Sequence, residues 1–226
     1  GLLLAARHPS AVDRLVLVGA ALPTDEPRLR LSTAFRIGLP LLPLFGPALM
    51  ERLARGRTAE SYVDDTMGFV MADPRRLDPG DRAVLVEFAT RRLRMPWATQ
   101  SFADASRSIA RTLVPASRFE STVHRVTVPT LIVQGADDQV VRPSSARWLA
   151  ERRPEWPMHL LAGVGHVPQL EVPDRFADLV IDTSESAAYG RRERFGSQYR
   201  EVPEALPLFM NAARTLETQL NVFATF

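Results

Sequence analysis

The sequence contains no cysteine and no lysine, and each absence narrows the chemistry open to the chain. Without cysteine there is no disulfide framework, no thiolate metal site and no thiol redox chemistry. All 28 basic residues are arginines, which we interpret as codon bias rather than arginine-specific recognition. They are scattered along the chain and balanced by 26 acidic residues, leaving a net charge of +2, so we expect no nucleic-acid partner.

The sequence is also poor in long hydrophobic runs. None approaches the length of about 18 residues that a membrane span requires, so we expect no membrane span. With 226 residues, 46% hydrophobic and 24% charged, the composition is typical of a globular protein of one or two domains. The four histidines do not show the spacing of a helical metal site, so we expect no metal and no other cofactor.

The apolar pattern divides the chain into four parts, with predicted boundaries at residues 1–22, 23–122, 123–183 and 184–226. In the first part, a helix end is followed by the apolar run Leu15–Val18, which is typical of a strand covered on both faces and is closed by Gly19. The second part is predicted to be an insertion of four or five helices. Proline and glycine predict its breaks near residues 38–47, 56–58, 73–74, 78–80 and 96.

Residues 123–183 return to an alternation of strands and helices. We predict strands at Pro129–Gln134 and Met158–Leu161, helices at Ser144–Arg153 and Pro173–Ile181, and a loop at Gly163–Gln169. Ser144 or Ser145 is expected to cap the first helix, with Trp148 and Leu149 on its apolar face. This alternation builds a parallel sheet, so the predicted fold class is α/β.

Two residues in this part have the types and positions needed for proton transfer. Asp138 lies in the turn after a predicted strand, at the sheet edge where α/β proteins gather ligands, and there it could orient an imidazole. Asp137 competes for that role, and either aspartate alone could be an ordinary turn residue. His166 follows 28 residues after Asp138, between glycines that favour a tight loop, and a neutral imidazole is suited to shuttle protons.

Three segments together resemble the α/β-hydrolase family. These are the opening of the chain up to Gly19, the turn containing Asp138, and the segment Gly165-His166-x-Pro168-x-x-Glu171-x-Pro173. The resemblance covers residues 1–22 and 123–183, and it implies Asp138 as the acid and His166 as the base of a catalytic triad. In that family the nucleophile precedes both, in a G-x-S-x-G turn before the first helix. By that alignment the nucleophile would lie about six residues before Gly1, so we expect this chain to be the C-terminal part of a longer hydrolase.

The resemblance implies hydrolysis of a small hydrophobic ester by a preceding serine, without a cofactor. Alternatives of the same fold are an epoxide hydrolase, with Tyr62 as a donor, a haloalkane dehalogenase, with Trp97 as a halide donor, and a C–C bond hydrolase. An alternative of another class is an inactive fragment or an interaction protein, because this chain by itself holds no nucleophile. His8, His124 and His159 are interpreted as structural or solvated.

The helical insertion is predicted to be a cap over the active site, as in capped members of the family. The apolar residues at 39–45 and 67–71 could line an acyl pocket, although such residues more often pack the core of the cap itself. Residues 184–226 have no counterpart in the family pattern. The arginine-rich stretch at 191–194 is interpreted as a solvated linker, and the amphipathic segment Ala205–Leu220 as a docking or dimerisation element, with the oligomeric state left open.

Overall fold

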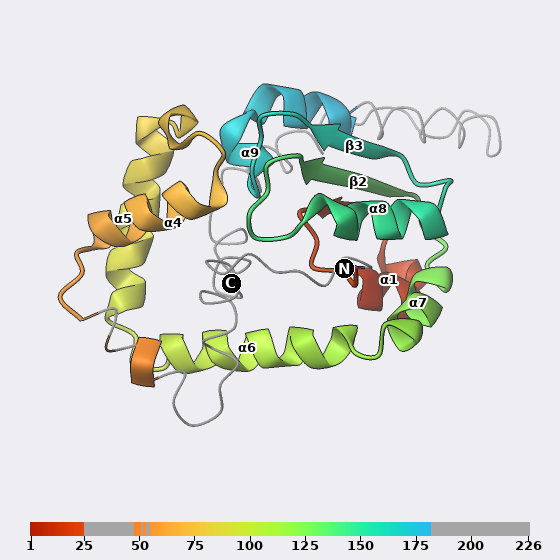
Figure 1. The fold of residues 1–226 in the computed structure, drawn as a ribbon, viewed down its shortest axis with the longest axis horizontal. Coiled ribbons are helices and arrows are strands. Elements are labelled where there is room, and N and C mark those ends of the chain that lie inside the picture. Colours follow the sequence, from red (N-terminus) through yellow and green to blue (C-terminus); the bar gives the residue numbers. More distant parts are fainter. Residues whose placement is uncertain (25–47, 51, 53–54, 182–226) are drawn as a thin grey trace.

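The computed structural model describes residues 1–24, 48–50, 52 and 55–181, and every structural statement below refers to these residues. In chain order the elements are α1 (Leu2–Arg7), the 3-10 turn η1 (Pro9–Ala11), β1 (Leu15–Val18), α4 (Ala59–Val70), the 3-10 turn η3 (Pro74–Arg76), α5 (Pro79–Leu93), α6 (Ala98–Leu113), α7 (Ala116–His124), β2 (Thr130–Gly135), α8 (Pro143–Arg152), β3 (Met158–Leu161) and α9 (Pro168–Glu171) (Figure 1). Residues 173–181 form a further helix.

The three strands form one parallel sheet in the order β1-β2-β3. Leu17 pairs with Ile132, and Val133 pairs with His159. All six residues of the central strand β2 are buried, as expected for a parallel strand covered on both faces. The predicted α/β class is confirmed, and β1 and β3 have the predicted bounds. The prediction for β2 was shifted by one residue, because Pro129 has no N–H to donate and contributes only its carbonyl, which accepts from the Leu15 N–H at 2.9 Å.

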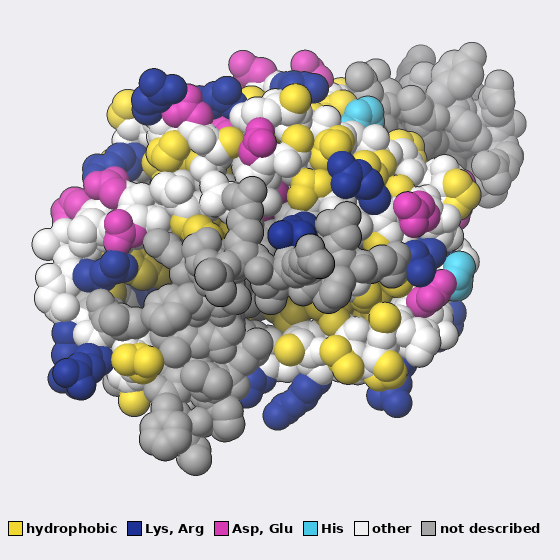
Figure 2. Space-filling view, viewed as in Figure 1, with side chains coloured by type: hydrophobic (Ala, Val, Ile, Leu, Met, Phe, Trp, Pro, Cys, Tyr) yellow, Lys and Arg dark blue, Asp and Glu magenta, His cyan; other side chains and the backbone are white. Residues whose placement is uncertain are grey.

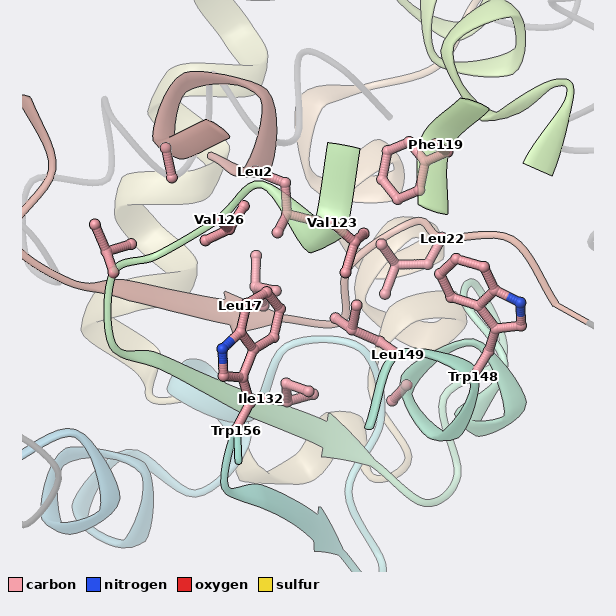
Figure 3. Close-up of a cluster of buried hydrophobic side chains, with 13 residues drawn as sticks. Leu2, Leu17, Leu22, Phe119, Val123, Val126, Ile132, Trp148, Leu149 and Trp156 are labelled. Atoms are coloured by element: carbon pink, nitrogen blue, oxygen red, sulfur yellow. The ribbon is translucent and has the colours of Figure 1, made fainter. Parts of the chain in front are cut away.

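Helices cover both faces of the sheet (Figure 1). On one face, side chains from α1, α7 and α8 form a cluster with Leu17 and Ile132, and Figure 3 shows these two strand residues pointing into it. Trp148 and Leu149 of α8 are buried in this cluster, as predicted. On the other face, Leu131 and Val133 pack against the helix at residues 173–181. Successive residues of β2 therefore serve opposite cores, as the alternation of side chains along a strand requires.

Helix α8 begins differently from its prediction. Its N-cap is Arg142, with Pro143 at the first helical position, and no side chain caps it. Proline needs no N–H partner there and already has the helical φ, so the serines are not required as caps. The Ser145 hydroxyl instead donates to the Leu22 carbonyl at 3.3 Å, which ties α8 to the segment after β1. The predicted serine cap was therefore wrong.

The insertion between β1 and β2 is helical, and four of its helices, α4 to α7, are described. The break predicted at 38–47 lies outside the described residues, whereas the others coincide with helix ends. Thr58 caps α4 by accepting from the Ser61 N–H at 3.2 Å, and Asp78 caps α5 by accepting from the Gly80 N–H at 2.7 Å. Helix α6 runs from the α4–α5 end of the molecule to α7 (Figure 1).

Helices α4 and α5 pack together and carry many of the charges on their end of the molecule. The Asp64 carboxylate on α4 accepts from Arg82 on α5 at 2.7 Å, which links the two helices. Figure 2 shows acidic and basic side chains interspersed over this end rather than separated by sign. Within the described part of the chain, no helix is both long and apolar enough to cross a membrane.

The inner side of the α4–α5 pair is apolar. Val63, Met67, Val70 and Met71 form one buried cluster with Val140 and Val141 from the loop after β2, Val167 from the loop after β3, and Leu170 of α9. The exposed fractions of Met67 and Met71 are 4% and 2%, so these two candidates for a substrate pocket are packing residues in this structure. The other candidate stretch, residues 39–45, lies outside the described residues. The insertion thus packs directly on the loops that carry Asp138 and His166.

Candidate functional site

Asp138 and His166 lie together at the carboxyl edge of the sheet. Asp138 follows β2 and His166 follows β3, and these strands are parallel neighbours, so their loops leave the same edge side by side. The backbone fixes this arrangement, because the Ala136 N–H donates to the Leu161 carbonyl at 2.9 Å and the Asp137 N–H donates to the Val164 carbonyl at 3.0 Å. Residues 28 apart in the sequence therefore come into contact.

The contact is a hydrogen bond between the two side chains. Nδ1 of His166 lies 2.8 Å from Oδ2 of Asp138, and the exposed fractions of the two side chains are 7% and 0%. An ionised carboxylate only accepts, so Nδ1 is the donor, and in the neutral ring Nε2 then carries the lone pair. The pair has the geometry of a base held in one tautomer by an acid.

Every acceptor position of the Asp138 carboxylate is filled by a donor. Oδ1 accepts from the backbone N–H groups of Val140 and Val141 at 2.8 and 2.9 Å, and Oδ2 accepts from Nε2 of Gln134 at 2.8 Å besides the imidazole. A buried carboxylate with four donors is fixed in position and has no lone pair left to seek another partner. The Asp138 carboxylate is therefore held in its orientation by Val140, Val141 and Gln134 independently of its hydrogen bond to His166.

Gln134 is a site residue that the sequence analysis did not identify. It is 1% exposed on β2, and besides Asp138 its amide nitrogen reaches the carbonyls of Gly135 and Val141, both at 3.2 Å. A signal was available in the sequence: Gln134 follows three apolar residues of a strand predicted to be buried, and a buried amide needs partners. Asp137 and Asp138 were polar side chains within reach along the chain, and the structure gives Asp138 as the partner.

Glycines let the backbone approach the His166 loop closely. Gly19, at the end of β1, has a φ of +50°, and a Cβ there would lie 2.7 Å from Nδ1 of His166. At Gly135 a Cβ would overlap the carbonyl oxygens of Val164 and Gly165. The ends of β1 and β2 therefore lie against the histidine loop, residues 163–166, and neither end leaves room for a side chain.

Gly135→Ala is expected to lower the free energy of unfolding by about 3 kcal/mol or more, because both sides of the overlap are backbone and neither can rotate away. The matched control is Gly68→Ala in α4, where a Cβ meets nothing within 4 Å. That control is expected to raise the unfolding free energy by about 0.5 to 1 kcal/mol. Urea unfolding of both variants measures the difference, and equal effects would contradict the close approach at Gly135.

The other candidates lie apart from this pair. Asp137 is exposed and only its backbone N–H takes part in the loop. His124 has a side chain 55% exposed at the end of α7, His159 lies on β3, and His8 is exposed after α1. Among the residues placed by the structure, no group of three or more histidine, aspartate and glutamate side chains could hold a metal ion.

The two donors proposed for related reactions differ in their surroundings. Tyr62 is half-buried and packs in the cluster of α4 and α5, and Trp97 is 58% exposed before α6. Of the residues predicted from the sequence, the structure therefore brings together Asp138 and His166. It adds Gln134, which was not predicted.

Comparison with known proteins extends these observations. The chain is 28% identical to the pimeloyl-(acyl-carrier protein) methyl ester esterase of Nitrosospira multiformis over 69 residues, which are 30% of this chain and 26% of the esterase. Among solved structures it is similar to Cfl2 from Burkholderia cenocepacia, with a TM-score of 0.59, 20% identity, and coverage of 79% of this chain and 59% of Cfl2. It is also similar to the 2-hydroxy-6-oxo-6-phenylhexa-2,4-dienoate hydrolase of Rhodococcus sp. strain RHA1, with a TM-score of 0.52, 18% identity, and coverage of 81% and 59%.

These structural likenesses concern the fold, and the chain spans between 57% and 59% of the length of the first solved structures that it matches. The family match is one of sequence pattern. The sequence pattern of the alpha/beta hydrolase family extends over residues 1–179, through α1, the sheet, the insertion and the histidine loop, and the chain belongs to that family.

Proposed function

We propose that the whole protein is a carboxylic-ester hydrolase in which His166 is the general base and Asp138 orients it. The observation that carries the proposal is the buried hydrogen bond between Nδ1 of His166 and Oδ2 of Asp138, at 2.8 Å, with the remaining acceptor positions of Asp138 filled. This arrangement favours the tautomer in which Nε2 accepts a proton. The similarity to a methyl ester esterase supports an ester as the substrate class.

The nucleophile is expected to be a serine on a segment before Gly1, in keeping with the chain order of the family. Nε2 of His166 takes the proton of the serine hydroxyl while the serine oxygen bonds to the ester carbonyl carbon. Asp138 stabilises the imidazolium, which then protonates the leaving alcohol as the ester C–O bond breaks. In the second half, His166 takes a proton from water as the water oxygen bonds to the acyl carbon, and it returns the proton to the serine oxygen as the bond between that oxygen and the acyl carbon breaks, releasing the carboxylic acid.

The helical insertion is proposed to act as a cap that selects an apolar acyl group. It is supported by the packing of α4 and α5 on Val140, Val141, Val167 and Leu170, which flank Asp138 and His166 in the chain. An apolar surrounding excludes water from the reacting groups and favours a hydrophobic substrate. Halide chemistry with Trp97 as the donor is not favoured, since the Trp97 side chain is exposed.

Two measurements on the whole protein test the proposal. Hydrolysis of a series of p-nitrophenyl esters of increasing acyl length is expected, together with stoichiometric labelling by a fluorophosphonate, which reacts with activated serines. Turnover of epoxides or haloalkanes without labelling would indicate an aspartate nucleophile and would refute ester hydrolysis. A folded protein with neither activity nor label would favour the interaction protein.

A further inference from the structure

Glu171 is the only glutamate that is buried among the described residues, and the proposed reaction does not use it. It ends α9, five residues after His166, and the exposed fraction of its side chain is 0%. A carboxylate in such a place is destabilising unless donors surround it. Its partners therefore indicate what it holds in place.

The donors come from two segments that are distant in the sequence. Oε2 accepts from the backbone N–H groups of Ala72 and Gly165, at 3.0 and 3.1 Å. Oε1 accepts from the backbone N–H of Asp73 at 3.3 Å and from the Arg76 guanidinium at 3.4 Å. One carboxylate thus joins the segment after α4 to the residue directly before His166.

Further contacts join the same two segments. The backbone N–H of His166 itself donates to the Val70 carbonyl at 2.6 Å, and Arg76 donates to the Gly163 carbonyl at 2.8 Å. The backbones also touch, because a Cβ at Gly165 would lie 2.7 Å from the Ala72 nitrogen. Residues 70–76, which we call the insertion strap, therefore lie against residues 163–166.

We infer that Glu171 is a positioning residue, which fixes the His166 loop to the insertion strap and so sets the place of the imidazole relative to Asp138. It acts through the backbone, since both of its oxygens are taken by donors of the strap and of Gly165. A shift of the strap moves Gly165 and His166 together, so the state of the helical insertion is transmitted to the base. The inference rests on the role proposed for His166.

Glu171→Gln is the sharpest test, because it preserves shape and removes one acceptor. Each oxygen of Glu171 faces two donors, so either orientation of the amide turns its NH2 group toward two N–H donors. In the whole protein we expect kcat for ester hydrolysis to fall by about 10- to 100-fold, because a displacement of about 1 Å is enough for such a loss. KM is expected to change little, since the substrate contacts remain.

The matched control is Glu155→Gln. Glu155 is also a carboxylate bonded to an arginine, at 2.5 Å from Nε of Arg153, but its side chain is 57% exposed. The pKa of Glu155 is lowered by its own backbone N–H first and by Arg153 second. Its replacement is expected to leave kcat and KM unchanged.

Arg76→Ala keeps the inference testable if Glu171→Gln does not fold. The Arg76 side chain is 41% exposed, and its loss leaves Glu171 with its three backbone donors. A smaller fall in kcat is expected, about 3- to 10-fold. Thermal unfolding of each variant establishes that it is folded at the assay temperature.

A readout independent of turnover completes the test. The chain has four histidines, so the low-field NMR signal of the imidazole N–H bonded to Asp138 can be assigned by its loss in His166→Ala. We expect this signal to persist in Glu155→Gln and to shift or broaden in Glu171→Gln and Arg76→Ala. If folded variants keep both the signal and the kcat of the unmodified protein, Glu171 only holds the fold and the inference is overturned. If the signal changes but even the unmodified protein hydrolyses no ester, the positioning role stands and the proposed function fails.

Discussion

Replacing His166 with alanine is expected to lower kcat for ester hydrolysis in the whole protein by about 10⁵- to 10⁶-fold. The imidazole is the group that removes the proton of the nucleophile, and no other histidine of the described residues touches Asp138. The fold is expected to persist, because Asp138 keeps its donors from Val140, Val141 and Gln134. The cost in unfolding free energy is about 1 to 3 kcal/mol, for one lost hydrogen bond to a buried group.

Steady-state kinetics and urea unfolding together measure this result. His124→Ala is the matched control, since that side chain is 55% exposed and lies at the C-terminal end of α7, away from Asp138. It is expected to leave both kcat and stability unchanged. A folded His166→Ala protein with more than about a tenth of the original kcat would refute the role assigned to His166.

Asp138→Asn is expected to lower kcat by about 10⁴-fold, whereas Asp137→Asn should change it by less than about threefold. The two side chains also differ in burial, since that of Asp138 is 0% exposed and Asp137 lies at the surface. Measuring kcat/KM for both variants over a range of pH around neutrality gives the comparison. The reverse order of effects would move the acid to Asp137.

The large effect of the Asp138→Asn amide has a specific cause. The oxygen of the introduced side chain must face either the N–H groups of Val140 and Val141 or the donors Gln134 and His166, and its NH2 group must face the other pair. If the oxygen stays with the two backbone groups, the NH2 group donates to Nδ1 of His166. The ring then carries its proton on Nε2 and cannot act as a base.

The strands could be predicted from sequence because their signals are local. Runs of β-branched and apolar residues ending in glycine marked β1 and β2, and the predicted β3 has the observed bounds. Parallel pairing then implied that the loop after β2 and the loop after β3 share one edge. Together with the resemblance to the hydrolase family, this led to the prediction that Asp138 and His166 meet.

Gln134 and Glu171, which bond to Asp138 and to the residue before His166, could not be predicted in this way. Glu171 bonds to Ala72 across 99 positions of the chain, and no local pattern encodes such a contact. Residues 168 and 169 were predicted to end a loop, but they begin the separate helix α9, whose last residue is Glu171. The burial that forces Gln134 and Glu171 to find partners depends on the assembled core, which no local stretch of sequence describes.

The insertion strap meets His166 and Glu171 largely through its main chain: the carbonyl of Val70 accepts from His166, and the N–H groups of Ala72 and Asp73 donate to Glu171. These atoms are present in every amino acid except proline, which has no N–H. The helices on either side of the strap are therefore free to diverge during evolution, or to be exchanged by an engineer, while the attachment is retained. New substrate preferences could thus arise in the insertion without rebuilding the chemistry beneath it.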